Sequence, residues 1–188
     1  MIARCLSDPL KPNLQLANAF MGIFGYKRMK PLLITIDPGL SGGFAFFAAG
    51  SVVAFPMPET NGDILAEIRT LKRRADAEQQ QCVAYLELVP TGMPNRGASM
   101  SKLNKNASFI EGVIMSHDIR LILIRPAEWQ SFFNLGKRSS CKNDYQWKKK
   151  LRGEAQRRFP QIKVTDETAD ALLIMEYALS AETERARG

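Results

Sequence analysis

Two apolar segments that each end on a carboxylate are the feature of this sequence that most limits its fold. Leu32–Asp37 reads Leu-Leu-Ile-Thr-Ile-Asp, and Cys82–Glu87 reads Cys-Val-Ala-Tyr-Leu-Glu. Both segments predict strands, and the second is continuously apolar, which is typical of a strand covered on both faces. We therefore expect a sheet enclosed by helices, in a layered α/β protein.

The segments around these two runs predict the remaining layers. Gly42–Ala48 and Val52–Phe55 predict two strands that continue the first one through tight turns, as in an antiparallel meander. Helices are expected over 63–80, 102–116, 127–133 and 145–159, a further strand over 120–125, and a final helix that Thr165 caps and that runs to about Ala181. This order resembles the ribonuclease H-like arrangement, a five-stranded mixed sheet flanked by helices in which the first three strands are antiparallel.

The chain length of 188 residues suits one domain with a substantial core. Residues 1–30 differ from the rest, because they carry a basic excess and two early prolines; we expect an N-terminal extension that is poorly ordered or peripheral. Translation from Met29 is an open alternative. The ribonuclease H-like domain is then expected over 31–181, followed by a polar tail over 182–188.

Cysteine usage and hydropathy indicate the compartment. Cys5, Cys82 and Cys141 lie far apart and show no metal-ligand spacing, which suits a reducing environment. No apolar run approaches the roughly 20 residues that a transmembrane helix needs, so no membrane partner is expected. We expect a cytoplasmic protein of a bacterium, or of the host if a phage encodes it. Organelle targeting by residues 1–30 stays open.

Acidic residues at strand ends and near the last helix predict a metal site. Asp37 and Glu87 end two strands that we expect to be neighbours, and Asp170 precedes the apolar run 171–174. Asp166 and Glu167, four and three residues earlier, could share its helix face. Each has a simpler explanation: Asp-Pro-Gly is ordinary turn chemistry, and acids at a helix start suit its dipole. A carboxylate ending an apolar strand is costly unless it is paired or liganded, so together they favour a site for hard divalent cations.

The sequence resembles the RuvC-type Holliday junction resolvases of the ribonuclease H-like superfamily, particularly their phage and organellar relatives. The matching segments, in order over roughly 31–180, are Ile36-Asp37-Pro38-Gly39, Ser41-Gly42-Gly43, Leu86-Glu87, Ser108-Phe109-Ile110-Glu111-Gly112, Arg125-Pro126-Ala127-Glu128-Trp129, Phe159-Pro160 and Ala169-Asp170-Ala171-Leu172-Leu173-Ile174. By position, the resemblance implies that Asp37, Glu87, Asp166 and Asp170 are the catalytic, metal-binding acids. Glu167 is the alternative to Asp166, as in the bacterial pattern. The implied cofactor is Mg²⁺ or Mn²⁺, with two ions per active site.

A basic segment supplies the expected DNA-binding surface. The chain has a formal net charge of +7, and Lys/Arg residues greatly outnumber acids between 137 and 158. A solvated helix usually mixes both signs, so the excess favours a phosphate-binding surface over simple solubility. The resemblance implies a catalytic lysine here, for which Lys148 aligns best and Lys142 is the alternative. The expected DNA-binding residues are Arg96, Lys102, Lys137, Arg138, Lys142, Lys149, Lys150 and Arg152.

Together with this resemblance, these residues predict a metal-dependent, structure-selective endodeoxyribonuclease that resolves four-way (Holliday) DNA junctions by paired symmetric nicks. The resemblance implies products with a 5′-phosphate and a 3′-hydroxyl, and a homodimer that uses the helix over 102–116, because two symmetric nicks require two active sites. Two alternatives stay open. One is a non-catalytic protein of the same fold that binds branched DNA or RNA. The other is a fragment of an actin-like-fold phosphotransferase, which would need a second domain and a second phosphate loop.

Overall fold

The structure, a computed structural model, describes residues 30–89 and 97–187. The chain divides after Lys30, and the unit that begins at Pro31 contains the architecture described below. Apart from Lys30, the predicted extension over residues 1–30 lies outside the described residues, as does the predicted DNA contact Arg96. None of the described helices is both long enough and apolar enough to cross a lipid bilayer.

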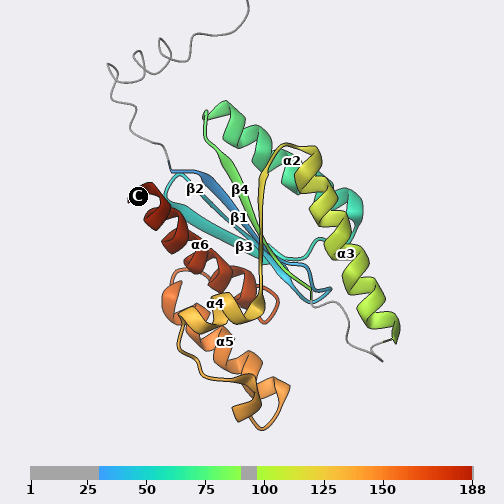
Figure 1. The fold of residues 1–188 in the computed structure, drawn as a ribbon, viewed down its shortest axis with the longest axis vertical. Coiled ribbons are helices and arrows are strands. Elements are labelled where there is room, and N and C mark those ends of the chain that lie inside the picture. Colours follow the sequence, from blue (N-terminus) through green and yellow to red (C-terminus); the bar gives the residue numbers. More distant parts are fainter. Residues whose placement is uncertain (1–29, 90–96, 188) are drawn as a thin grey trace, which may run out of the picture. The chain divides into compact units, whose positions relative to one another are not determined.

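A five-stranded mixed sheet forms the centre of the domain (Figure 1). Its strands are β1 (Leu32–Asp37), β2 (Gly43–Ala48), β3 (Ser51–Pro56), β4 (Cys82–Glu87) and β5 (Arg120–Ile124), in the spatial order β3-β2-β1-β4-β5. The first three strands pair antiparallel, whereas β4 runs parallel to both β1 and β5. This confirms the predicted fold class, α/β with a ribonuclease H-like sheet, and the strand bounds agree within one residue or so with those expected.

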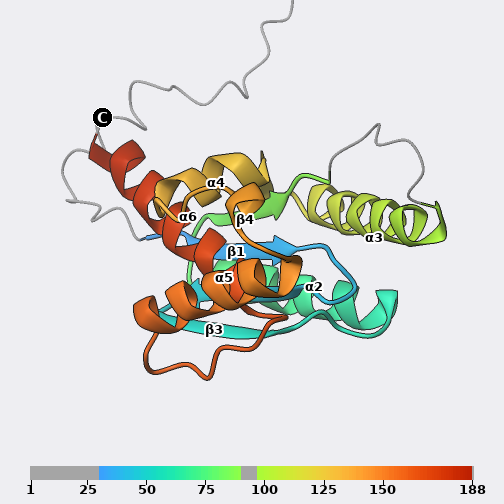
Figure 2. The ribbon, with the colours of Figure 1, turned by 90° about the horizontal axis from the view of Figure 1, so that it is seen from below.

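Helices cover both faces of the sheet. The described helices are α2 (Asn61–Ala77), α3 (Gly97–Ser116), α4 (Pro126–Phe132), the short 3₁₀ helix η1 (Arg138–Ser140), α5 (Asp144–Arg158) and α6 (Ala169–Arg187). Figure 1 shows α2 and α3 on one side of the sheet and α4, α5 and α6 on the other. In Figure 2, which views the domain from the side of α5, both α5 and α6 lie in front of β1.

Alternation along β1 explains the two-sided burial. Leu32, Ile34 and Ile36 join the core beneath α2 and α3, whereas Leu33 joins the core that α4, α5 and α6 cover. Successive side chains of a strand point to opposite faces, so an apolar run with no polar alternation requires a cover on each side. The expectation of an enclosed sheet is therefore confirmed at residue level.

Two helices are longer than predicted. Helix α6 continues to Arg187, past the predicted end at Ala181, and α3 begins at Gly97 rather than at Lys102. The polar composition of 182–188 misled the prediction, because Glu182 is anchored rather than solvated. It accepts a hydrogen bond from the Tyr85 hydroxyl at 2.8 Å and forms a 2.5 Å ion pair with Arg120.

Candidate active site

Asp37 and Glu87 lie at the same end of two neighbouring strands. Strands β1 and β4 are parallel, and their register pairs Ile36 with Leu86, so that each strand places its acid directly after this pair. The carboxyl ends of parallel strands are where α/β proteins commonly build their sites. The backbone N–H of Gly39 donates a 3.0 Å hydrogen bond to Oδ1 of Asp37, which holds that carboxylate in the turn after β1.

Two glycines let the chain close in around Asp37. A Cβ atom on Gly42 would lie 2.4 Å from the carbonyl oxygen of Asp37 and 2.7 Å from its Oδ2, distances that real Cβ atoms do not show. A Cβ on Gly43 would lie 2.6 Å from the carbonyl oxygen of Glu167. Gly42 therefore keeps the Asp37 carboxylate in its position, and Gly43 lets the segment before α6 approach β2.

Asp170 reaches the same region because α6 is fastened to the first strand. The Thr35 hydroxyl, which is fully buried, donates a 2.7 Å hydrogen bond to the carbonyl of Ala171. Thr35 lies two residues before Asp37, and Ala171 follows Asp170. The contact therefore joins the two acid-bearing elements across most of the sequence.

Glu87 is held by a tryptophan. The indole Nε1–H of Trp129, on α4, donates a 2.9 Å hydrogen bond to Oε1 of Glu87. Trp129 is fully buried and meets the ring of Phe133 edge to face at 6.4 Å. The sequence interpretation treated Trp129 only as part of a motif and of the core. The sequence did contain one indication of this contact: Trp129, whose indole can donate a hydrogen bond, lies only five residues after the end of β5, the strand that pairs with β4.

Asp37, Glu87 and Asp170 lie at one end of the sheet, and we call these three residues the acidic cluster. Their carboxylates interact electrostatically. Burial raises the pKa of Asp37, against the Gly39 N–H and the charge of Lys148. Burial, then the charges of Asp37 and Asp170, raises the pKa of Glu87 to about 8. Burial, then the charge of Asp37, raises the pKa of Asp170 to about 7. Burial thus raises the pKa of all three acids, and repulsion between like charges adds to this at Glu87 and Asp170.

The acidic cluster has the donor chemistry of a divalent cation site but not a formed coordination shell. Within 30–89 and 97–187, no group of three or more His, Cys, Asp or Glu side chains is arranged so that it could hold a metal ion. In the same residues, no basic side chain lies within 4.0 Å of the three carboxylates as an ion-pair partner. Desolvated carboxylates that repel one another and lack a cationic partner are suited to an oxygen-seeking cation such as Mg²⁺. The predicted metal ligands thus fit the group chemically, and two-metal binding stays a prediction.

The two candidates for a fourth acid have different surroundings. Both lie in the turn that precedes α6. The charge of Asp166 contributes to the raised pKa of Asp170, and its own carboxylate forms a 3.1 Å ion pair with Arg152. For Glu167, a hydrogen bond from the Thr165 hydroxyl is the largest cause that lowers its pKa. The electrostatic link to Asp170 favours Asp166.

Lys148, the predicted catalytic lysine, acts electrostatically on two members of the acidic cluster. It lies on α5, and its charge lowers the pKa of both Asp37 and Asp170. Arg138 also lowers the pKa of Asp170, although it forms a 2.7 Å ion pair with Asp144. Lys142, the alternative to Lys148, is exposed.

Some of the other predicted DNA-binding side chains interact with groups of the protein itself, and the others face solvent. Arg152 pairs with Asp166, and the ammonium of Lys150 donates to the carbonyl of Leu135. The residues that are exposed and form no ion pair within the described part of the chain are Lys102, Lys137, Lys142 and Lys149.

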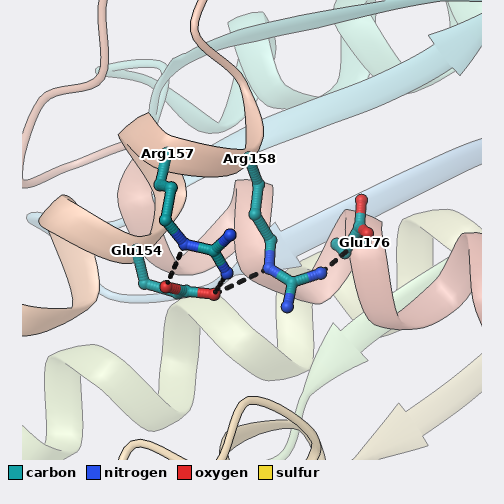
Figure 3. Close-up of polar contacts among 4 residues, drawn as sticks. All are labelled: Glu154, Arg157, Arg158 and Glu176. Atoms are coloured by element: carbon teal, nitrogen blue, oxygen red, sulfur yellow. Dashed lines mark hydrogen bonds and ion pairs between the residues drawn. The ribbon is translucent and has the colours of Figure 1, made fainter.

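Part of the basic excess on α5 supports the fold. Glu154 accepts hydrogen bonds from both Arg157 and Arg158, and Arg158 reaches Glu176 on α6 at 2.9 Å (Figure 3). The Arg158 guanidinium also lies 4.7 Å from the centre of the Phe133 ring. Arg158 therefore fastens α5 to α6, and Arg157 is paired within α5, so the charge that faces phosphate is smaller than the sequence suggests.

Comparisons with known proteins bear on the fold. Neither a protein-family model nor a curated protein matches the sequence. Among solved structures, a T. thermophilus RuvC in complex with Holliday junction substrate aligns with 12% identity and a TM-score of 0.49, covering 77% of this chain and 90% of that chain. A Thermus thermophilus RuvC structure aligns with 15% identity and a TM-score of 0.46, covering 76% and 90%. Likeness of this degree does not assign an activity.

Proposed function

We propose that this protein is a metal-dependent endonuclease that resolves four-way DNA junctions by paired symmetric nicks. The observation that carries the proposal is the convergence of Asp37, Glu87 and Asp170, which are buried and close enough that the charge of Asp37 raises the pKa of both Glu87 and Asp170. Such a cluster is costly to fold and has no structural role that a neutral side chain would not fill better. The free-energy cost of burying these carboxylates is explained if the site binds cations when the protein functions.

Asp37, Glu87 and Asp170 would hold the divalent ions, Mg²⁺ or Mn²⁺, with Asp166 as a fourth ligand. When bound, two such ions activate the attacking water and neutralise the leaving oxygen in phosphodiester hydrolysis. Gly39 fixes Oδ1 of Asp37 through its N–H, and Gly42, which has no side chain, packs closely beside the carboxylate without displacing it. These two contacts hold the carboxylate of Asp37 in the turn after β1, where it would meet an incoming cation.

Lys148 would stabilise the charge that develops on the scissile phosphate. Its charge lowers the pKa of Asp37 and Asp170, which supports a role for Lys148 beside a phosphate held over the acidic cluster. A preorganised cation at this position lowers the energy of the transition state more than that of the bound substrate. The exposed lysines 137, 142 and 149 extend positive charge from this point for backbone contacts.

A panel of labelled substrates tests the proposal. Four-way junction, flap, linear duplex and RNA–DNA hybrid are incubated with the protein in Mg²⁺ and, separately, in EDTA. We expect Mg²⁺-dependent cleavage of the junction in preference to the other three. Binding of the junction with no cleavage in Mg²⁺ would instead indicate the non-catalytic alternative.

Paired nicks require two active sites on one junction, so we propose a twofold homodimer. Light scattering during size-exclusion chromatography should give twice the mass of the 188-residue chain. A strictly monomeric protein that cuts only one strand would contradict the paired-nick part of the proposal and leave the metal-dependent nuclease in place.

A further inference from the structure

Resting on the proposed function, we propose that Trp129 is a positioning residue for the metal site: its indole N–H fixes one oxygen of Glu87, so that the other oxygen faces the incoming divalent cation. The contact is direct, because Nε1 of Trp129 lies 2.9 Å from Oε1 of Glu87. Oε2 of Glu87 accepts no hydrogen bond from any other described residue. Trp129 therefore holds Oε1 of Glu87, and Oε2 has no donor among the described residues.

The neutrality of the donor matters. A lysine or arginine in place of the indole would hold Glu87 equally well, but its charge would repel a cation and cancel the charge of the ligand. An indole N–H donates without adding charge. Asp37 also receives a hydrogen bond from a neutral donor, because the backbone N–H of Gly39 holds its Oδ1. Two members of the acidic cluster are thus oriented by neutral donors, and their negative charge stays available.

The fold fixes Trp129 relative to Glu87. Strand pairing places Glu87 opposite Ile124, and the Leu88 N–H donates a 2.8 Å hydrogen bond to the Ile124 carbonyl. Helix α4 starts directly after this point, with Pro126 in its first turn. Phe133 holds the indole from the side, and no part of Trp129 is exposed. The donor therefore cannot swing away without moving α4, which is what a positioning residue requires.

The test replaces the donor and preserves the aromatic ring. Trp129→Phe removes the N–H, and Trp147→Phe is the matched control because Trp147 is also buried in the same core but lies on α5. Mn²⁺ binding is measured by calorimetry on each full-length protein without DNA, after circular dichroism has confirmed folding. We expect W129F to bind Mn²⁺ about tenfold or more weakly, the usual effect of removing a group that orients a metal ligand. W147F should bind as the wild type does.

Equal Mn²⁺ affinity in W129F and wild type would overturn the inference while leaving the proposed function intact. Failure of the wild-type protein itself to bind Mn²⁺ would contradict the proposed function, and the role of Trp129 with it.

Fluorescence covers the case in which W129F does not fold. The chain has two tryptophans, so W147F keeps Trp129 as its only indole. Paramagnetic Mn²⁺ bound by Glu87 should quench this emission, Mg²⁺ should compete with the quenching, and Glu87→Gln in the same background should remove it. Emission that is unchanged at Mn²⁺ concentrations that saturate the calorimetric signal would overturn the inference.

Discussion

The Thr35 hydroxyl donates a 2.7 Å hydrogen bond to the carbonyl of Ala171, a residue 136 positions later in the sequence. Thr35 is fully buried in β1, and Ala171 lies in the first turn of α6. The contact lies between the elements that present Asp37 and Asp170. It joins β1 to α6 close to both acids, so its loss should affect both stability and cleavage.

Thr35→Val keeps the shape of the side chain and removes the donor. We expect a loss of about 1–2 kcal/mol in the free energy of unfolding, since a buried hydrogen bond is lost, together with slower cleavage. Urea unfolding measures the first effect and a nicking assay the second. Thr183→Val, which removes a 2.7 Å bond to Leu179 on the exposed side of α6, is the control and should change stability by less than about 0.5 kcal/mol. Unchanged stability in T35V would show that the contact does not fasten α6.

Gly42→Ala should abolish cleavage without removing any functional group. The added methyl would lie 2.4 Å from the Asp37 carbonyl oxygen, so the turn or the carboxylate must move. We expect destabilisation of about 1–3 kcal/mol from overpacking. Gly153→Ala is the control for which we expect the opposite change in stability. A Cβ added at Gly153, in α5, would have no atom within 4 Å, so this substitution should stabilise the helix by about 0.5–1 kcal/mol. Full activity in G42A would contradict the tight closure around Asp37.

The acidic cluster should make the metal-free protein less stable at alkaline pH. The pKa of Asp170 is raised to about 7 in the folded state from an ordinary 3.8, so its protonated form is favoured by folding. That contribution is complete below pH 3.8 and is lost as the pH rises through 7. In EDTA, Asp170→Asn should therefore raise the melting temperature at pH 8 more than at pH 5. An equal effect at both values would mean that Asp170 is not desolvated.

Glu154 should show the opposite dependence. Its pKa is lowered to about 2 by its hydrogen bond from Arg157 and then by that from Arg158, against burial (Figure 3). The stabilisation is present above the ordinary pKa of 4.5 and is lost as the pH falls towards 2. Glu154→Gln should thus destabilise the protein at pH 6 more than at pH 3. Glu184→Gln, which removes an exposed charge near the end of α6, should have little effect at either pH. A pH-independent effect of E154Q would exclude the ion pairs as its cause.

The sequence was informative where periodicity and burial decide the structure. The continuous apolar character of β4 predicted an enclosed sheet, and acids at the ends of β1 and β4 followed directly from strand positions. Tertiary contacts were beyond its reach. In the sequence, Trp129 looks like an ordinary core residue, and only the structure shows that α4 places its indole beside Glu87. Likewise, Glu182 looks like part of a polar tail, and only the structure shows that Tyr85 and Arg120 bind it. Similarly, Arg157 and Arg158 counted as DNA-facing charge, although Arg157 binds Glu154 within α5 and Arg158 joins α5 to Glu176 on α6.

Single-turnover cleavage of a labelled four-way junction in Mg²⁺, by wild type and by Asp37→Asn, tests the central claim most directly. Junction binding in EDTA is measured on the same samples. The account predicts that wild type cuts in Mg²⁺ only, and that D37N binds the junction with similar affinity but does not cut it. Cleavage by D37N at the wild-type rate, or wild-type cleavage that persists in EDTA, would contradict the assignment of the acidic cluster as the metal-binding catalytic site.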